Sequence, residues 1–521
     1  MTSANDLVRL PATTLSKMLT HEEVSSTELT RAVLDRIDAV DGRVRAYTTV
    51  LRERALADAS RADEERRKGR SRGPLHGLPV SVKESLEMAG HASTLGVTAR
   101  ATKVATADSV LVRMLREAGA VIVGRTNVSQ LLLYHESKNP LFGQTNNPFS
   151  AAHGPGGSSG GEAAAIAAGM SCIGIGGDIG GSIRGPAHVC GIAGLKPTLD
   201  RWSVQGSHTA LPGQETIRGQ TGPMGRTVGD ITMLMSALDA KRMSALDWRV
   251  PPLEWEDPAR VDVPRLRVGF YTDDGVLAAS PAVARAVHRA CDALRSAGCE
   301  VVPFTPPNAL DMIFTYAAAM SADAGATGTA TIGKGEVDPT LAALLRIARL
   351  PDAVRGTIAG VLAMRGETVA AGILRSLGRK SVEALWAITA KIRAYRFTYG
   401  AALDAAGIDI VLCPPHATPA IPHGASKDFA FAGSYSMLYN VLQFPAGVVP
   451  VTMVRPDETH RPHPRQRMEK MAADVDRQSK GLPVGVQVVA RPWAEPTVLA
   501  AMTEIERSVR GDDGFPVTPV P

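Results

Sequence analysis

A glycine-rich stretch, residues 154–187, contains the side chains with the clearest chemical potential. It reads GPGGSSGGEAAAIAAGMSCIGIGGDIGGSIRGPA and holds four serines, Ser158, Ser159, Ser171 and Ser182. A serine hydroxyl becomes an effective nucleophile only when a neighbouring group takes its proton. The stretch contains no histidine, so the proton acceptor must come from another part of the chain.

A histidine from further along the chain is one candidate acceptor. The overlapping stretches GGSSG (156–160) and GSSGG (157–161) both fit G-x-S-x-G, the nucleophile turn of α/β-hydrolases. That interpretation needs an acidic residue and then a histidine downstream. Several downstream histidines could serve, which weakens the case for any one of them, and this alternative stays open. They are His188, His208, His288, His416 and His423.

Two further glycine-rich motifs do not support nucleotide binding. GTATIGKG (328–335) has Gly335 where a phosphate-binding loop needs the hydroxyl that holds magnesium. GIGGDIG (174–180) has Ile179 where the dinucleotide fingerprint needs its third glycine. We therefore expect no nucleotide cofactor.

The long glycine-rich motifs resemble a known family. GGSSGGEAAAIAAG (156–169) and GGDIGGSIRGPAHVCGIAGLKPT (176–198) are similar to the two halves of the signature of the amidase signature family. GPLHGLPVSVKES (73–85) is similar to the strand that carries this family's catalytic lysine. The resemblance implies an enzyme that hydrolyses amides and needs no metal or other cofactor.

The resemblance also assigns roles by motif position. Lys83 is expected to be the base, Ser158 the bridging serine, which follows a cis peptide bond, and Ser182 the nucleophile. Such enzymes form an acyl-enzyme through this Ser–cis-Ser–Lys triad. The implied oxyanion hole consists of the backbone amides of Ile179, Gly180, Gly181 and Ser182.

Elementary chemistry supports these roles. A lysine amine has a pKa near 10.4 in water and is protonated at pH 7. Burial disfavours the charged form by up to about 3–5 units, so a buried Lys83 can accept a proton. A serine hydroxyl can relay it because it both donates and accepts. The glycines before Ser182 let backbone N–H groups approach the negative oxygen of the tetrahedral intermediate.

Several residues near the triad have structural interpretations. We expect Asp178 and Arg184 to form an ion pair that supports the loop. Ser159 and Glu162 have the Ser-x-x-Glu spacing of a capping box for the helix that follows. Lys196, in GLKPT, is interpreted as structural.

Alternating apolar segments predict an α/β fold. Val80–Val82 and 120–124 are predicted as strands, and Val110–Ala118 as an amphipathic helix. We expect one large amidase-signature domain with a central mixed, mostly parallel twisted sheet and helices on both faces. The expected parts are an N-terminal helical segment packed on the core (1–68), the α/β/α domain (69–510), a helical cap within it (341–380) and an exposed excursion (455–480).

Composition excludes other classes. Hydrophobic residues make up 44% of the chain and charged residues 21%, as in globular proteins with a sizeable core. A net charge of +5 without a recognition motif does not indicate nucleic-acid binding. Five cysteines without a CxxC pair, and the lack of an N-terminal signal core, indicate a cytoplasmic protein. The apolar run Ala163–Gly177 is shorter than the roughly 20 residues of a membrane span, so we expect it in the core.

The resemblance extends to fatty acid amide hydrolases within the family. It covers about residues 70–505 and includes KNPLFGQTNNP (138–148) and GLPVGVQVVARPW (481–493). A small-molecule amide with an apolar acyl group is therefore the expected substrate. Apolar side chains suited to its pocket, which are equally interpretable as core, are Leu132, Leu133, Met437 and Val441.

Three questions stay open at this point. The segment 341–380 is amphipathic and basic, so peripheral membrane contact and an ordinary surface hairpin are both considered. A homodimer is one possible assembly. The alternative functions are a glutaminase subunit of a tRNA-dependent amidotransferase, for which no arginine is evidently placed to bind the glutamine carboxylate, and a non-catalytic lipid-binding protein.

Overall fold

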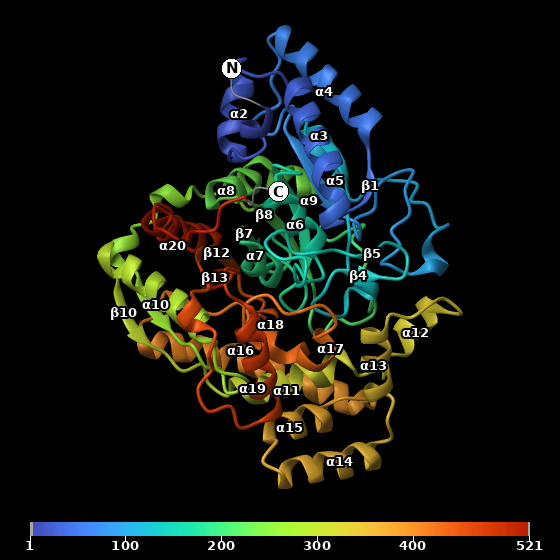
Figure 1. Ribbon diagram of the computed structural model, residues 1–521, viewed down its shortest axis with the longest axis vertical. Helices are drawn as coiled ribbons and strands as arrows, with labels where there is room; N and C mark the ends of the chain where they lie inside the picture. The colour runs from blue at the N-terminus through green and yellow to red at the C-terminus, as the bar shows by residue number, and fades with distance from the viewer. Residues whose placement is uncertain (1–3, 519–521) are drawn as a thin grey trace.

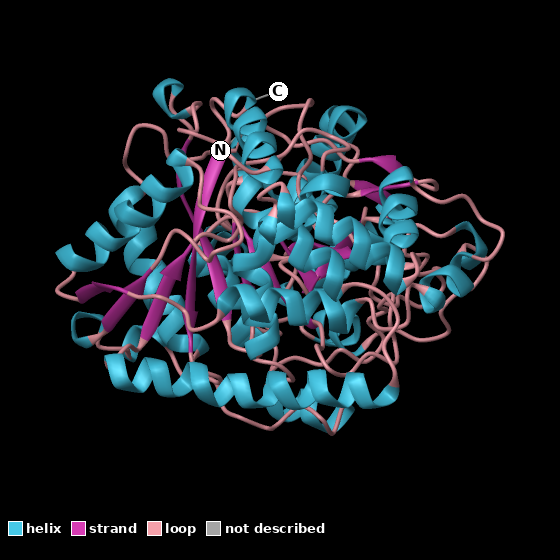
Figure 2. Cartoon of the chain, turned by 90° about the horizontal axis from the view of Figure 1, so that it is seen from below, coloured by secondary structure: helices cyan, strands magenta, loops and turns pink. Residues whose placement is uncertain are grey.

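A single large β-sheet organises the chain, and helices enclose it (Figure 2). The computed structural model describes residues 4–518. The sheet has eleven strands in the described chain, in the spatial order β1 (Tyr47–Val50), β3 (Val121–Thr126), β2 (Pro79–Lys83), β6 (Ile173–Asp178), β8 (Gln220–Gly225), β7 (Ala193–Lys196), β12 (Ala446–Met453), β13 (Pro483–Ala490), β11 (Ile410–Cys413), β9 (Arg267–Phe270) and β10 (Glu300–Pro303). A separate hairpin pairs β4 (Lys138–Asn139) with β5 (Gly143–Gln144).

The predicted mixed α/β sheet is confirmed, but its central strands pair antiparallel rather than parallel. Parallel pairing is concentrated in two blocks, β3–β2–β6 and β11–β9–β10. The strands between these blocks, from β6 through β8, β7, β12 and β13 to β11, pair antiparallel. A parallel pair needs a long crossover, usually a helix, whereas the connection between β7 and β8, residues 197–219, contains no helix.

The central strands are buried along their length. Every residue of β13 is buried, and its sequence PVGVQVVA is rich in valine. Helices on both sides remove such strands from water, so they read as continuous apolar runs rather than as alternating patterns. The run Ala163–Gly177, expected in the core, consists of the end of one helix, the buried connection 168–172 and most of β6.

Helices cover both faces of the sheet, and further helices lie beyond it at two ends of the molecule (Figure 1). Those of the first half are α1 (Ala4–Leu7), α2 (Ala12–Thr20), α3 (Ser26–Val44), α4 (Arg52–Arg67), α5 (Val110–Glu117), α6 (Gly160–Ala167), α7 (Arg184–Cys190), α8 (Val228–Ala237), α9 (Ala240–Leu246) and α10 (Pro281–Ser296). Those of the second half are α11 (Ala309–Met320), α12 (Ala326–Ile332), α13 (Pro339–Ala348), α14 (Asp352–Met364), α15 (Thr368–Ser376), α16 (Val382–Ala406), α17 (Ser426–Phe429), α18 (Ser434–Leu442), α19 (Arg467–Gln478) and α20 (Glu495–Val509).

The first 68 residues contribute both helices and a strand. Helix α3 begins with a capping box in which the Ser25 side chain accepts from the Glu28 amide. Leu15, Leu29 and Val33 belong to the same hydrophobic cluster as β2 and β3. Strand β1, which the sequence did not predict, pairs antiparallel with β3 and forms one edge of the sheet.

Two later segments, residues 341–380 and 455–480, contain helices outside the central sheet. Residues 341–380 form most of α13 and all of α14 and α15, which lie at the lower end of the molecule in Figure 1. Residues 455–480, expected to be exposed, contain α19, and the carboxylate of the completely buried Asp476 in this helix accepts a hydrogen bond from Arg461 at 3.0 Å. This segment is therefore exposed on one side only.

Candidate active site

Two parallel strands bring the candidate residues to one edge of the sheet. Lys83 is the last residue of β2, and Asp178 is the last residue of its parallel neighbour β6. Parallel strands place their carboxyl ends at the same edge, where α/β proteins hold ligands in the loops that follow. The glycine-rich loop before α6 reaches the same place and presents Ser158 to Lys83.

The amine of Lys83 is enclosed and contacts two serines. Its Nζ lies within hydrogen-bond distance of Ser158 Oγ and Ser159 Oγ, each at 2.8 Å, and of the carbonyl of Gly177 at 3.2 Å. Only 1% of the residue is exposed. The peptide bond between Gly157 and Ser158 is cis, as the resemblance implied. Lys83 and Ser158, 75 residues apart in sequence, are therefore in direct contact.

The protonation of Lys83 follows from this enclosure. Burial lowers the pKa of the amine to about 7, although the carboxylates of Asp178, Glu162 and Glu84 act in the opposite direction. Burial is the larger effect because removing an ammonium from water is costly. A substantial fraction of Lys83 is therefore neutral at pH 7, and this fraction can accept a proton.

Ser182 lies on the loop after β6 and faces the same space. Its backbone carbonyl accepts a hydrogen bond from the Ser159 amide at 3.1 Å. Its hydroxyl has no hydrogen-bond partner within residues 4–518, so the expected link to Ser158 is not closed in this structure. Lys83, Ser158 and Ser182 all line one cavity of about 140 Å³. Hydrogen bonds of this kind often tighten only once substrate is bound.

The loop Ile179–Ser182 is held from behind by Asp178. The carboxylate of Asp178 accepts hydrogen bonds from the amides of Gly181 (2.9 Å) and Ile183 (3.0 Å). Gly181 has a φ of +102°, a conformation that favours glycine. The Gly181 amide is therefore already engaged and is not free for the expected role as an oxyanion donor, whereas Ile179 and Ser182, two of the other expected donors, line the cavity.

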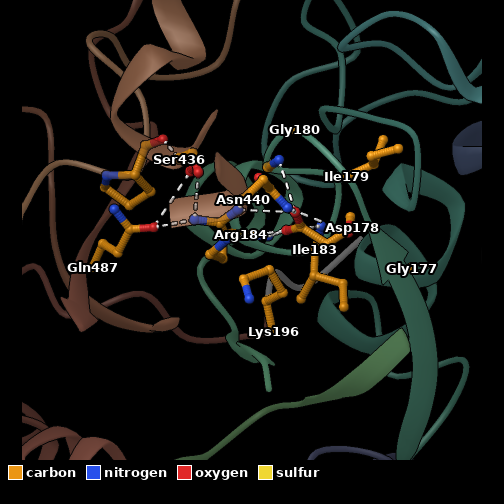
Figure 3. Close-up of polar contacts among 12 residues, drawn as sticks. Gly177, Asp178, Ile179, Gly180, Ile183, Arg184, Lys196, Ser436, Asn440 and Gln487 are labelled. Atoms are coloured by element: carbon orange, nitrogen blue, oxygen red, sulfur yellow. Dashed lines mark hydrogen bonds and ion pairs between the residues drawn. The ribbon is translucent and has the colours of Figure 1, made fainter. Parts of the chain in front are cut away.

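The predicted ion pair between Asp178 and Arg184 is confirmed and belongs to a larger network (Figure 3). The two side chains are fully buried, with Arg184 Nη2 2.9 Å from Asp178 Oδ1. Burial raises the pKa of the Asp178 carboxyl, but Arg184 and several hydrogen bonds outweigh it and hold the pKa well below its usual range. Arg184 also donates to Asn440 Oδ1 (2.7 Å), Gln487 Oε1 (2.6 Å) and the Ser436 carbonyl (2.9 Å), from α18 and β13. The sequence did not predict these three partners.

The predicted capping box at α6 is wrong. Ser159 precedes the helix, but its side chain makes no cap hydrogen bond because its hydroxyl contacts Lys83 and Gly177. The carboxylate of Glu162 instead accepts hydrogen bonds from Ser81 and Thr126 on β2 and β3. Lys196, interpreted as structural, is buried and donates to the carbonyl of Pro197 at 2.9 Å.

One wall of the cavity is apolar. Leu132 and Leu133 line it, as expected. Met437 lies behind the loop Ile179–Ser182, where a Cβ on Gly180 would come within 3.8 Å of its Cγ. Val441 is completely buried in the core, and its carbonyl accepts a hydrogen bond from Arg396, so it does not form this wall. Additional apolar lining residues that the sequence did not reveal are Leu131, Val204, Ala210, Leu211 and Met320.

The lining of the cavity also includes polar side chains, which the sequence did not predict. Arg218 is one of them, although the sequence showed no arginine evidently placed to bind a glutamine carboxylate. Arg218 is bonded through both terminal nitrogens to Asp200 (2.8 and 2.6 Å) and lies 3.2 Å from Glu215. The guanidinium group is therefore already paired with these two carboxylates. Other polar lining residues are His208, Gln214 and Arg249.

The histidines nominated from the sequence have other partners than the candidate serines in the described chain. His188 is fully buried, its ring contacts the carbonyls of Thr418 and Gly485, and burial lowers its pKa to about 4. His208 lines the cavity but pairs with Glu87 at 3.0 Å. None of the five nominees forms a hydrogen bond with Ser158 or Ser182 in the described chain. The geometry favours the lysine hypothesis.

Comparisons with known proteins agree with this geometry. The sequence model of the family described as Amidase matches residues 28–499. The chain is 40% identical over 443 residues to fatty-acid amide hydrolase 1 of Sus scrofa, covering 84% of this chain and 76% of that protein. It is 35% identical over 444 residues to fatty acid amide hydrolase 1 of Caenorhabditis elegans, with 84% and 77% covered.

A solved structure shows the same fold. The structure named fatty acid amide hydrolase superposes with a TM-score of 0.84 at 26% identity, over 98% of this chain and 87% of that one. The match extends over nearly the whole sheet and its helices rather than over the signature alone. The chain therefore belongs to the amidase signature family and is an enzyme that hydrolyses amides.

Proposed function

We propose that this amidase cleaves amides with an apolar acyl group by forming an acyl-enzyme on Ser182, with Lys83 as base and Ser158 as proton relay. The observation that carries the proposal is the buried Lys83 amine, 2.8 Å from Ser158 Oγ, in a cavity that Ser182 also lines. The overall change converts an acyl amide and water into a carboxylic acid and an amine.

The hydrogen bonds around Lys83 suit a neutral base. Ser159 Oγ lies 3.2 Å from the Gly177 carbonyl, which can only accept, so the single Ser159 hydroxyl proton is directed there. Ser159 therefore receives one Lys83 N–H, and the Gly177 carbonyl receives the other. A neutral amine has no third N–H. Its lone pair is left for the proton of Ser158, the contact that a relay requires.

The reaction then follows from these contacts. Ser158 passes its proton to Lys83 and takes the proton of Ser182 as the Ser182 oxygen attacks the amide carbon. Free backbone amides of the loop Ile179–Ser182 stabilise the negative oxygen of the intermediate, each by roughly 3–4 kcal/mol where such donors have been measured. The Lys83 ammonium returns its proton through Ser158 to the departing amine. Water then attacks the acyl-enzyme with the same base and releases the acid.

A hydrolysis panel tests the substrate class. We expect kcat/KM to rise by at least about tenfold from acetamide to oleamide, since each buried methylene contributes about 0.8 kcal/mol and only part of a chain contacts Leu131–Leu133. N-acyl ethanolamines and aryl anilides in the panel identify the amine. Preference for L-glutamine would favour the amidotransferase subunit, and binding of lipid without any turnover would favour the non-catalytic alternative.

The surface of α14 supports a contact with membranes. Val354, Ile358, Val361 and Met364 recur at helical spacing and are 38–82% exposed. Exposed arginines flank them, namely Arg346, Arg349, Arg365, Arg375 and Arg379. An apolar helix face bordered by cations suits an anionic lipid surface, so we propose peripheral docking of a cytoplasmic enzyme through this segment. Within the described chain, no helix is long and apolar enough to cross a bilayer.

Co-sedimentation with vesicles checks this contact. We expect binding to phosphatidylglycerol vesicles, and a loss of at least about tenfold in the double variant Ile358→Glu, Met364→Glu, because burying each apolar side chain contributes about 1.5–3 kcal/mol. Trp248→Ser is the matched control, since Trp248 is 88% exposed but follows α9, far from α14 in Figure 1. Unchanged binding of the double variant would refute docking here, and a change of its mass in light scattering would assign this face to a homodimer.

A further inference from the structure

A second buried ionisable side chain lies beside Lys83 and has no part in the steps above. Glu162, in the first turn of α6, is completely buried. Its carboxylate accepts hydrogen bonds from the hydroxyls of Ser81 and, at 2.6 Å, of Thr126. No cationic side chain forms an ion pair with it within residues 4–518. A buried carboxyl held by hydroxyl groups alone needs an explanation.

The register of the sheet places this carboxyl next to the base. Ser81 and Lys83 lie two residues apart on β2, so their side chains point to the same face. Thr126 is the partner of Lys83 in the ladder between β2 and β3, and Gly174 on β6 is the partner of Ser81. A Cβ at Gly174 would overlap Glu162 Oε1. Three adjacent strands therefore leave a space beside the lysine that the carboxyl fills.

Few other charges face these two groups. Burial raises the pKa of Glu162 to about 7, while Ser81, Thr126 and Lys83 act in the opposite direction. The pKa of Lys83 is lowered to about 7, so both groups titrate in one pH range and the charge of each influences the other. The remaining groups that face the pair are Tyr47, near Glu162, and Asp178 and Glu84, near Lys83 and balanced by Arg184 and Arg125.

We propose that Glu162 is a positioning residue that acts through Lys83: held by Ser81 and Thr126 in the buried space beside the lysine, it sets the proton affinity of the catalytic amine. The inference rests on the proposed function. An ionised Glu162 stabilises the ammonium that forms when Lys83 takes the serine proton. A protonated Glu162 withdraws that support and leaves the amine neutral between turnovers.

The pH profile of Glu162→Gln tests this role. The amide has the same shape, and the hydroxyls of Ser81 and Thr126 can rotate to donate to its oxygen and accept from its nitrogen. The variant lacks the carboxylate, so the Lys83 ammonium loses a favourable neighbour and the pKa of the amine falls. We expect the acidic limb of kcat/KM, near pH 7 in the unmodified enzyme, to move down by about one unit.

Two further variants keep the test decisive. Glu506→Gln removes another buried carboxyl, on α20, whose pKa burial also raises to about 7; it accepts from the Val228 amide and should leave the limb in place. Thr126→Val removes one hydrogen bond that favours ionised Glu162, so a smaller shift in the same direction is expected even where Glu162→Gln does not fold.

The outcomes separate this inference from the function on which it rests. The role of Glu162 is overturned if the acidic limb stays in place in folded Glu162→Gln. Where Glu162→Gln does not fold, an unmoved limb in Thr126→Val overturns it instead. In either case, labelling of Ser182 by a fluorophosphonate would still support the serine mechanism. An unmodified enzyme that neither hydrolyses amides nor takes the label would instead reject the proposed function itself.

Discussion

Replacing Ser182 by alanine should abolish both amide hydrolysis and labelling by a fluorophosphonate probe. The Ser182 hydroxyl lines the cavity beside Lys83 and Ser158, and it is the oxygen that would form the acyl-enzyme. Removing a nucleophile that works with a base costs about 10⁵-fold or more in kcat, because the remaining groups have no atom to activate. Mass spectrometry of the labelled, digested protein locates the modified residue, and steady-state assays measure the loss.

Ser171→Ala is the matched control for this variant. Ser171 lies in the same glycine-rich stretch, but its hydroxyl donates to the carbonyl of Ile173 at 2.9 Å and it does not line the cavity. It should keep its activity and its label. Full labelling of Ser182→Ala would show that another residue is the nucleophile, and Ser158, on the same cavity, would then be the one to examine.

The sequence was sufficient to nominate the candidate residues that the fold brings together. Lys83 and Ser158 lie in dense local motifs, and the fold brings them to 2.8 Å. The supporting residues have no such motif. Arg184 is held by Asn440 and Gln487, which follow it by 256 and 303 residues, and Tyr316 donates to the Ile179 carbonyl across 137 residues. Only the packing of α11, α18 and β13 against the loop creates these contacts.

Local patterns also failed where a residue had two possible partners. Ser159 and Glu162 have the spacing of a helix cap, but each finds a competing partner in the tertiary structure, the Lys83 amine for one and the hydroxyls of Ser81 and Thr126 for the other. Burial decides this competition, since a polar group inside the core must be satisfied there. A cap exposed to water, such as Ser25 and Glu28 on α3, forms as its spacing predicts.

The fold was predicted best where burial produces clear runs or periodic patterns of apolar residues. The strands at Val80–Val82 and 120–124 and the helix α5 were expected close to their observed bounds. The antiparallel centre of the sheet was not expected. Its strand β8, QTGPMG, contains glycine and proline and resembles a loop in isolation, and β7, AGLK, is short and contains glycine. Their pairing depends on neighbours far away in the sequence, and no local period reveals it.

Replacing Lys83 by methionine should lower kcat/KM by at least about 10³-fold and remove the acidic limb of its pH profile. General acid–base catalysis contributes about 10²–10⁴-fold, and in the proposed mechanism one amine serves both in acylation and in release of the amine. Burial lowers the pKa of Lys83 to about 7, so the neutral, active form is favoured above this pH and is lost as the pH falls through it. Methionine fills a similar volume but has no titrating group, and its residual rate should lack this limb.

Lys196→Met is the control that separates loss of the base from loss of a buried lysine. Burial lowers the pKa of Lys196 to about 7 as well, yet its amine donates to the Pro197 carbonyl and does not line the cavity. This variant should keep the acidic limb and most of the activity if it folds, which circular dichroism and thermal unfolding establish for both variants. An unchanged limb in folded Lys83→Met would assign the base to another group, and His208, the histidine that lines the same cavity, would be the first to test.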